Sequence, residues 1–309
     1  MTVPDTTSGR RAQLLQDLDR RILCLDGATG TWLQGQDLGP SDFGGEEFEG
    51  CNENLVLTRP DLILDLHRAY LAAGADIIET NTFGATPLVL AEYPPLETKT
   101  YEINRRAAEL ARQAAAEFDT DRLHYVAGSI GPTTKAISVT GGVTFLELIE
   151  NFEAQAAALL DGGVDYLLLE TCQDTRNIKA ALCAIDNLSK SRDEHIPIAV
   201  SGTIEPMGTM LAGQSAEALA VSVAHIDLLY IGLNCATGPE FMTDHIRALS
   251  QLSTARVACV PNAGLPDEEG DYLETPEMVA GIVGRFVDEG WINLAVSYTH
   301  LTLPTIYSV

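Results

Sequence analysis

The residue best placed for chemistry is a cysteine at the end of an apolar run. Cys235 follows Leu228–Asn234, which predicts a buried strand, and it precedes Gly238-Pro239, a pair typical of a helix start. Its thiol should therefore point out of the hydrophobic scaffold at a strand end. There it can act as a metal ligand, as a nucleophile or as a packed core residue. One thiol alone cannot hold zinc, because a zinc site takes several protein ligands.

Two carboxylates occupy equivalent places, because Glu79 and Glu170 also end predicted strands. A buried carboxylate is costly unless a partner compensates its charge. We interpret Glu170 as the acid that receives a substrate ammonium group, and Glu79 as a hydrogen-bond brace across the same face. Another predicted strand is followed by Asp26, Gly27 and Ala28. Small residues of this kind let backbone N–H groups approach a small anion, such as the carboxylate of an amino acid.

Two common kinds of site find little support. No histidine before residue 297 lies in a strand-end motif, which argues against a Ser-His-Asp triad and against a histidine-rich metal site. The segment Gly128–Lys135 resembles a phosphate-binding loop only superficially. Its glycine spacing is wrong, and Pro132 lacks the backbone N–H that such a loop needs.

The other cysteines are weaker candidates than Cys235. Cys172 ends a predicted strand, but the acids Glu170 and Asp174 beside it oppose formation of a thiolate. Three more lie inside predicted strands or helices and are interpreted as small core residues, namely Cys24, Cys183 and Cys259.

The segments that must position these residues alternate short apolar runs with longer amphipathic stretches. The runs are mostly continuous, as expected for parallel strands buried on both faces. Eight strands are predicted, at Ile22–Leu25, Asp76–Glu79, His124–Gly128, Asp165–Leu169, Pro197–Val200, Leu228–Leu233, Arg256–Val260 and Trp291–Val296. Helix starts are predicted at Pro60, Asp174, Pro239 and Pro276. This alternation predicts an α/β protein with a single (β/α)8 barrel, whose strand-end motifs gather at one face; a doubly wound open sheet is the alternative.

The ends of the chain are expected to differ from the barrel. Residues 1–20 are predicted to form an N-terminal arm or helix, and residues 21–296 the barrel domain. Residues 297–309 change character abruptly, and Pro304 interrupts the little chain that remains after the eighth strand. We therefore expect the eighth helix to be missing or degraded, and we interpret the tail as a non-native end.

Composition excludes several classes of partner. The 309 residues carry a formal net charge of −25, which opposes binding to nucleic acid and to anionic membranes. No uncharged apolar run is long enough to span a membrane, and residues 1–10 are too polar for a signal peptide. The six cysteines follow no disulfide framework, so reduced thiols in the cytoplasm are expected.

Several long motifs, taken together and in order, resemble the homocysteine S-methyltransferase family. The similarity is closest to the N-terminal homocysteine-binding module of cobalamin-dependent methionine synthase, and it extends from Arg21 to Leu294. The motifs that carry it are Asp26–Thr31, Leu57–Pro60, His67–Tyr70, Gly74–Phe83, Gly128–Pro132, Glu170–Asp174 and Gly232–Cys235. The resemblance implies a (β/α)8 barrel that transfers a methyl group to the thiol of homocysteine and yields methionine.

The resemblance also implies roles for individual residues. In the family, Zn²⁺ at the barrel mouth is held by one cysteine after the sixth strand and by two adjacent cysteines after the eighth. Cys235 matches the first of these. Asp26, Gly27 and Ala28 match the loop that holds the amino acid end of homocysteine, and Glu170 matches the acid that meets its ammonium group. Zinc removes the substrate's thiol proton and presents a thiolate, the form that attacks well.

The methyl donor differs within the family. In the closest relatives another module carries methylcobalamin, so the resemblance implies cobalamin- and folate-binding modules as partners in the parent protein. Other members use small donors of the S-methylmethionine or betaine type, and a module that binds homocysteine without activity of its own is a further alternative. A barrel lyase or aldolase is the rival from another enzyme class. It needs a strand-end lysine, for which Lys135 is the only candidate, and a phosphate loop that has no match here.

The sequence departs from the family pattern after the eighth predicted strand. No cysteine follows Cys259, so the adjacent pair is missing, and His300 alone does not replace it. We therefore expect this chain to bind zinc weakly and to turn over little or not at all, although the parent protein methylates homocysteine.

Overall fold

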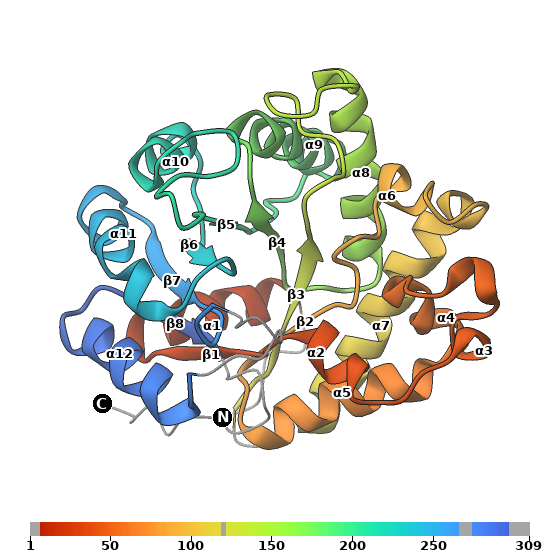
Figure 1. Cartoon of the computed structure of the whole chain (residues 1–309), viewed down its shortest axis with the longest axis horizontal. Helices are drawn as coiled ribbons and strands as arrows, with labels where there is room; N and C mark the ends of the chain where they lie inside the picture. The colour runs from red at the N-terminus through yellow and green to blue at the C-terminus, as the bar shows by residue number, and fades with distance from the viewer. Residues whose placement is uncertain (1–6, 119–121, 266–273, 297–309) are drawn as a thin grey trace.

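Eight parallel strands close into a barrel in the order of the sequence (Figure 1). The computed structural model describes residues 7–118, 122–265 and 274–296. The strands are β1 (Leu23–Leu25), β2 (Ile77–Glu79), β3 (Tyr125–Ile130), β4 (Tyr166–Cys172), β5 (Ile198–Gly202), β6 (Tyr230–Asn234), β7 (Arg256–Val260) and β8 (Leu294–Val296). β8 closes the ring on β1, with Leu23 opposite Leu294. The predicted (β/α)8 barrel is confirmed, and the doubly wound sheet is wrong.

Helices surround the strands and connect them (Figure 1). The longer ones are α1 (Thr7–Arg20), α5 (Pro60–Ala73), α7 (Thr100–Phe118), α8 (Phe145–Asp161), α9 (Thr175–Arg192), α10 (Ala216–Val223), α11 (Pro239–Leu252) and α12 (Pro276–Asp288). The short ones are α2 (Thr29–Gln34), α3 (Pro40–Phe43), α4 (Leu55–Thr58) and α6 (Pro87–Leu90), with 3-10 turns at Glu46–Phe48, Asn52–Asn54 and Leu96–Lys99. The predicted helix starts are confirmed, and Asp174 caps α9 by accepting a hydrogen bond from the Arg176 N–H at 2.8 Å.

The strand most altered relative to its prediction is β4. It continues past Leu169 to Cys172, and its register against β5 shifts between these two residues. Within this bulge Thr171 has a φ of 52°, in the left-handed region. A bulge re-aims side chains, so Glu170 lies on an irregular strand end rather than in a loop after the strand. The predicted loss of an eighth helix concerns residues 297–309, which lie outside the described part.

The lower and middle layers of the barrel interior are filled by side chains. Leu14 and Leu18 of α1 are buried against the interior residues at the base, among them Leu23. Tyr166 and Tyr230 meet inside the barrel, with their phenol oxygens 2.9 Å apart in a hydrogen bond. Because these layers are packed, the room for a ligand lies at the C-terminal ends of the strands.

A second and larger core lies between the outer face of the strands and the surrounding helices. It holds the scaffold in place by burying the apolar stripes of the amphipathic helices. In the described residues, no helix combines the length and the apolar character needed to cross a membrane.

Candidate active site

The C-terminal ends of the strands surround a cavity of about 350 Å³, called here the barrel-mouth pocket. All the site residues expected from the sequence line it, namely Asp26, Gly27, Ala28, Glu170 and Cys235. They follow or end different strands, so the closed barrel is what brings them to one place. Glu79 at the end of β2 and Ser129 of β3 line the same pocket.

Asp26 lies directly after β1 and is 3% exposed. Its Oδ2 accepts a hydrogen bond from the Glu79 N–H at 3.0 Å, which joins the ends of β1 and β2. Its Oδ1 has no hydrogen-bond partner among the described residues. Burial raises the pKa of Asp26 well above its ordinary value, and the charge of nearby Glu170 adds to this effect while the Glu79 N–H opposes it. The pocket thus contains a buried carboxyl oxygen that a ligand can engage.

Two more carboxyl groups belong to the same cluster. Glu170 accepts a hydrogen bond from Ser129 Oγ, and burial raises the pKa of Glu170 to about 7. Burial, followed by the charges of Glu170 and Asp26, raises the pKa of Glu79 well above its ordinary value. No described side chain donates a hydrogen bond to the Glu79 carboxylate, so the interpretation of Glu79 as a brace gains no support.

This acid cluster, Asp26 with Glu79 and Glu170, has no cationic side chain beside it among the described residues that line the pocket. Desolvation and mutual repulsion both favour protonated carboxyl groups in such a place. An ammonium group brought into contact would favour the charged carboxylates instead. The arrangement therefore suits a ligand that carries a primary ammonium group.

Cys235 lies directly after β6 and lines the same pocket. Its φ of 60° and the φ of 55° at Ala236 are both left-handed, and its N–H bonds to Val260 O at 3.1 Å. Asn234 Nδ2 donates a hydrogen bond to Cys235 Sγ at 3.2 Å. Burial is the main cause that raises the pKa of the Cys235 thiol, with Glu170 second, while Thr171 and Asn234 lower it. The thiol is therefore held in a defined place, but its surroundings favour the protonated form.

The residues present do not fit a zinc site of three thiolates. Within residues 7–118, 122–265 and 274–296, no group of three or more His, Cys, Asp or Glu side chains has the geometry to hold a metal ion. Residues 297–309 contain one histidine and no cysteine, aspartate or glutamate. Cys259, which lies on the neighbouring strand, is buried with its Sγ 3.9 Å from Met242 Sδ in the outer core. The role of Cys235 as a metal ligand stays a prediction.

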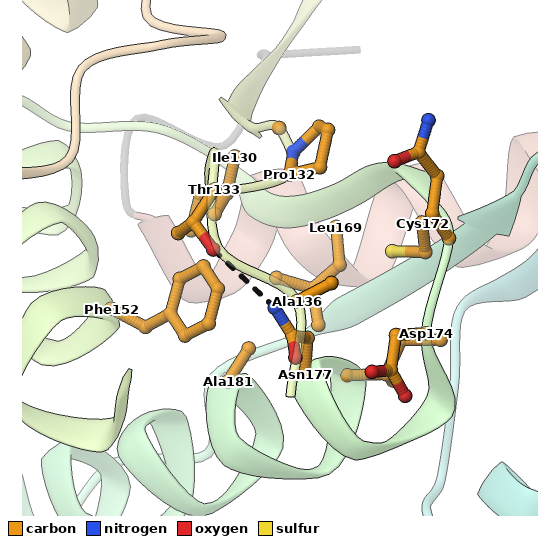
Figure 2. A pocket seen from close by; sticks show the side chains of 13 residues that line it. Ile130, Pro132, Thr133, Ala136, Phe152, Leu169, Cys172, Asp174, Asn177 and Ala181 are labelled. Carbon is orange, nitrogen blue, oxygen red and sulfur yellow. Dashed lines mark hydrogen bonds between the residues drawn. The ribbon is translucent and has the colours of Figure 1, made fainter. Parts of the chain in front are cut away.

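Cys172 does not join the barrel-mouth pocket either. Figure 2 shows its sulfur at the edge of a separate cavity of about 30 Å³, which lies between the ends of β3 and β4 and the start of α9. Phe152 lines this cavity, and Asn177 Nδ2 donates to Thr133 Oγ1 beside it at 3.3 Å. A space of that size holds about one water molecule, so we read it as a packing defect.

The core interpretation of the remaining cysteines needs one correction. Cys259 is buried as predicted and Cys24 is half-buried, but Cys183 is exposed. On α9 the buried face carries Ile178, Leu182 and Ile185, and Cys183 is turned about 100° from Leu182. The Cys183 side chain therefore points away from the core in which the Leu182 side chain is buried.

Two site residues were missed by sequence reasoning. Glu53 lines the pocket from the 3-10 turn before α4 and accepts a hydrogen bond from the Gly84 N–H at 2.6 Å. Asn234 links strand ends next to Cys235. The position of Asn234 at a strand end was a usable signal, whereas nothing in the loop sequence around Glu53 marks it.

Comparison with known proteins gives matches in family and in fold. Residues 23–296 match the model of the family described as homocysteine S-methyltransferase. The homocysteine methyltransferase MmuM from Escherichia coli has a similar structure. Its metallated form superposes with a TM-score of 0.72 at 21% identity, over 94% of this chain and 95% of the other. Its oxidised form gives 0.70 at 23%, over 93% and 95%, and its apo form gives 0.69 at 19%, over 96% and 100%. At these identities the superpositions show a shared fold.

Proposed function

The chain belongs to the homocysteine S-methyltransferase family of methyltransferases, and from that premise we propose that the barrel-mouth pocket binds homocysteine for methyl transfer to its thiol. The homocysteine sulfur attacks the methyl carbon of the donor, so that a carbon–sulfur bond forms while the bond between the methyl group and the donor breaks. The donor leaves with that electron pair, the thiol proton is lost to solvent, and the product is methionine. The observation that carries this proposal is the acid cluster, which has no cationic side chain among its described neighbours in the pocket and adjoins a loop of small residues. Together they suit the ammonium and carboxylate groups of one amino acid.

In the proposed complex each end of homocysteine has its own partners. The ammonium group binds Glu170 and the unpartnered oxygen of Asp26, and its charge holds both carboxylates ionised. The substrate carboxylate binds the backbone at Gly27 and Ala28, where small side chains permit close approach. The sulfur then extends across the pocket toward Cys235.

We propose that activation of the sulfur is the step this chain performs poorly. The family implies a zinc ion, which supplies a thiolate at neutral pH when it is bound. Cys235 would be one ligand, but the described residues supply no others of a three-cysteine site. Homocysteine bound here therefore keeps most of its thiol protonated, because a free thiol has a pKa above 8 or so.

Metal analysis tests this directly. After incubation with Zn²⁺ and gel filtration, we expect the purified chain to retain well under about one equivalent of zinc, since a lone thiol gives no closed site. Replacing Tyr298 and Thr299 by cysteine, and supplying a helix after them, is expected to restore stoichiometric zinc. Tight, stoichiometric zinc in the unaltered chain would contradict the proposal.

For the methyl donor we propose methylcobalamin on a separate module, with a folate-binding module in the parent protein. The support is the distribution of exposed apolar side chains. Met207 is 81% exposed and Leu146 is 71% exposed, and both lie in segments that follow strands on the side of the pocket. Others in equivalent segments are Phe83, Val139, Phe145, Leu211, Phe241, Leu265 and Met278. Apolar side chains gathered around a pocket are typical of a protein-docking surface.

The donor and the substrate are tested separately. Homocysteine binding is measured by calorimetry, and methionine formation by mass spectrometry with methylcobalamin, S-methylmethionine or betaine as donor. We expect homocysteine to bind and all donors to give little methionine; faster turnover with a small donor would support the small-donor alternative.

Glu170→Gln is expected to weaken homocysteine binding by about tenfold through loss of one charge-assisted contact. Glu205→Gln, outside the pocket on the same face, is the matched control. Equal affinity of the two variants would defeat the proposal.

We also propose a reducing compartment, the cytoplasm, for this chain. All six cysteines are free, including the exposed Cys183 and the half-buried Cys235. Free thiols of this kind persist where the surroundings keep them reduced.

A further inference from the structure

A single asparagine side chain links the ends of three strands beside Cys235. Asn234 is 4% exposed. Its Oδ1 accepts hydrogen bonds from the Thr171 N–H at 3.0 Å and from Ser201 Oγ at 2.7 Å. Its Nδ2 donates to Thr171 Oγ1 at 2.7 Å and to Cys235 Sγ at 3.2 Å. The amide therefore uses both of its donor hydrogens and both of its acceptor positions.

The partners fix which way this amide points. A backbone N–H can only donate, so the amide oxygen must face Thr171 N, and the NH₂ group then faces Cys235. An amide N–H cannot accept, so the sulfur of Cys235 is the acceptor. One lone pair of the sulfur is thereby engaged by the Asn234 N–H group. The S–H bond and the other lone pair of the sulfur point away from Asn234.

The backbone is strained in both of the segments that the Asn234 side chain joins. Thr171, Cys235 and Ala236 are left-handed without being glycine, with φ values of 52°, 60° and 55°. A residue of this kind is strained and persists only where its surroundings determine its conformation. Asn234 bonds to two of these three residues, and Thr203 Oγ1 holds its carbonyl oxygen at 3.0 Å.

We propose that Asn234 is a positioning residue, which fixes the Cys235 sulfur relative to the neighbouring acid Glu170 by binding Thr171 and Cys235 at once. Thr171 follows Glu170 directly, so the same side chain sets the place of the acid on β4 and of the thiol after β6. The inference rests on the proposed function, in which one ligand extends from the acid to the sulfur. Asn234 lines the barrel-mouth pocket, and in the proposed complex it acts through Thr171 and Cys235.

The test is the rate at which iodoacetamide alkylates Cys235 at pH 8, with each modified cysteine identified by peptide mass spectrometry. Exposed Cys183 on α9 is the internal reference. Asn234→Asp keeps the shape of the side chain and replaces the donor beside the sulfur by a carboxylate. We expect the ratio of the Cys235 rate to the Cys183 rate to fall by about tenfold, because a like charge disfavours the thiolate. Methionine affinity, measured by calorimetry, should change by less than about threefold.

Two further variants keep the result interpretable if Asn234→Asp folds poorly. Thr171→Val removes the hydroxyl that accepts a hydrogen bond from Asn234 Nδ2 and that lies 4.0 Å from Cys235 Sγ, and it should change the rate ratio by about threefold. Ser201→Ala removes a donor on the oxygen side, away from the sulfur, and is the matched control with an expected change under about twofold.

Three outcomes would overturn the positioning role. They are an unchanged rate ratio in both Asn234→Asp and Thr171→Val, a faster Cys235 reaction in Asn234→Asp, or equal losses of rate ratio and methionine affinity, which indicate general disruption of the mouth. If the unaltered chain binds no homocysteine, the proposed function fails, whereas the alkylation ratio still tests the placement of the sulfur.

Discussion

The two ends of the barrel bury the same kind of side chain in opposite ways. At the base, Asp165 and Asp76 are 1% and 2% exposed, and each is paired with two arginines. The pairs are Arg10 and Arg112 with Asp165, at 3.1 and 2.5 Å, and Arg21 and Arg122 with Asp76, both at 2.8 Å. At the mouth, Asp26 is 3% exposed, Glu79 and Glu170 are half-buried, and this acid cluster has no described cation beside it.

This difference distinguishes acids that stabilise the fold from acids whose charge a bound ligand can compensate. A buried charge that is paired and hydrogen-bonded is stable in the fold, and removing its partner is strongly unfavourable. A buried carboxyl group without a partner carries a free-energy cost that a bound cation can relieve. The acids at the base are therefore stabilised by arginines of the barrel itself. The acids at the mouth are stabilised only when a ligand supplies a positive charge.

The largest effect on stability should come from a substitution that removes an ion pair at the base of the barrel. Asp165→Ala removes the acceptor for two arginines and for the Val126 N–H, which bonds to Asp165 Oδ2 at 2.8 Å. We expect a loss of about 3 kcal/mol in the free energy of unfolding, measured by urea titration. Methionine affinity of the variant that remains folded should be unaltered. A loss of affinity without a loss of stability would mean that the base and the mouth are not separate.

A smaller effect should appear as a pH dependence of stability that comes from the mouth. Because the pKa of Glu170 is raised to about 7 from an ordinary 4.5, the folded state binds the proton more tightly than the unfolded state. The resulting stabilisation is complete below pH 4.5 and is lost as the pH rises through 7. In Glu170→Gln this decline should be reduced, so that the variant gains ~2 kcal/mol relative to the parent between pH 5 and 8. Parallel urea curves for the two proteins across this range would refute the assignment.

The smallest effect is expected for an acid that is neither enclosed nor part of the site. Asp186 pairs with Lys190 at 2.6 Å on the outer face of α9, and both side chains are exposed. Lys190→Ala should leave the free energy of unfolding essentially unchanged, because solvent screens such pairs. Urea titration beside Asp165→Ala measures the contrast directly, and a change comparable to that of Asp165→Ala would show that burial does not decide the effect.

The sequence predicted the barrel because its strands are continuous apolar runs, and a run such as Arg256–Val260 is recognisable without any contact information. It also predicted that Asp26, Glu170 and Cys235 share one face, because polar residues at the ends of parallel strands meet there. These predictions needed only local patterns and the closure of the ring.

Features that depend on side-chain geometry were not predictable in the same way. The bulge that displaces Glu170 arises from the pairing of β4 with β5, and a register shift has no local signal in Leu169–Cys172. The exposure of Cys183 depends on the rotation of α9 against its neighbours. The roles of Asn234 and Glu53 depend on hydrogen bonds between segments far apart in the sequence.

The packed tyrosines inside the barrel, Tyr166 and Tyr230, also have a kinetic consequence. Among the described residues they fill the middle of the barrel interior, so substrate and product should share the entrance at the mouth and occupy the same pocket. Methionine must then depart before the next homocysteine arrives, and it should act as a competitive inhibitor whose strength reports how firmly the mouth holds any amino acid.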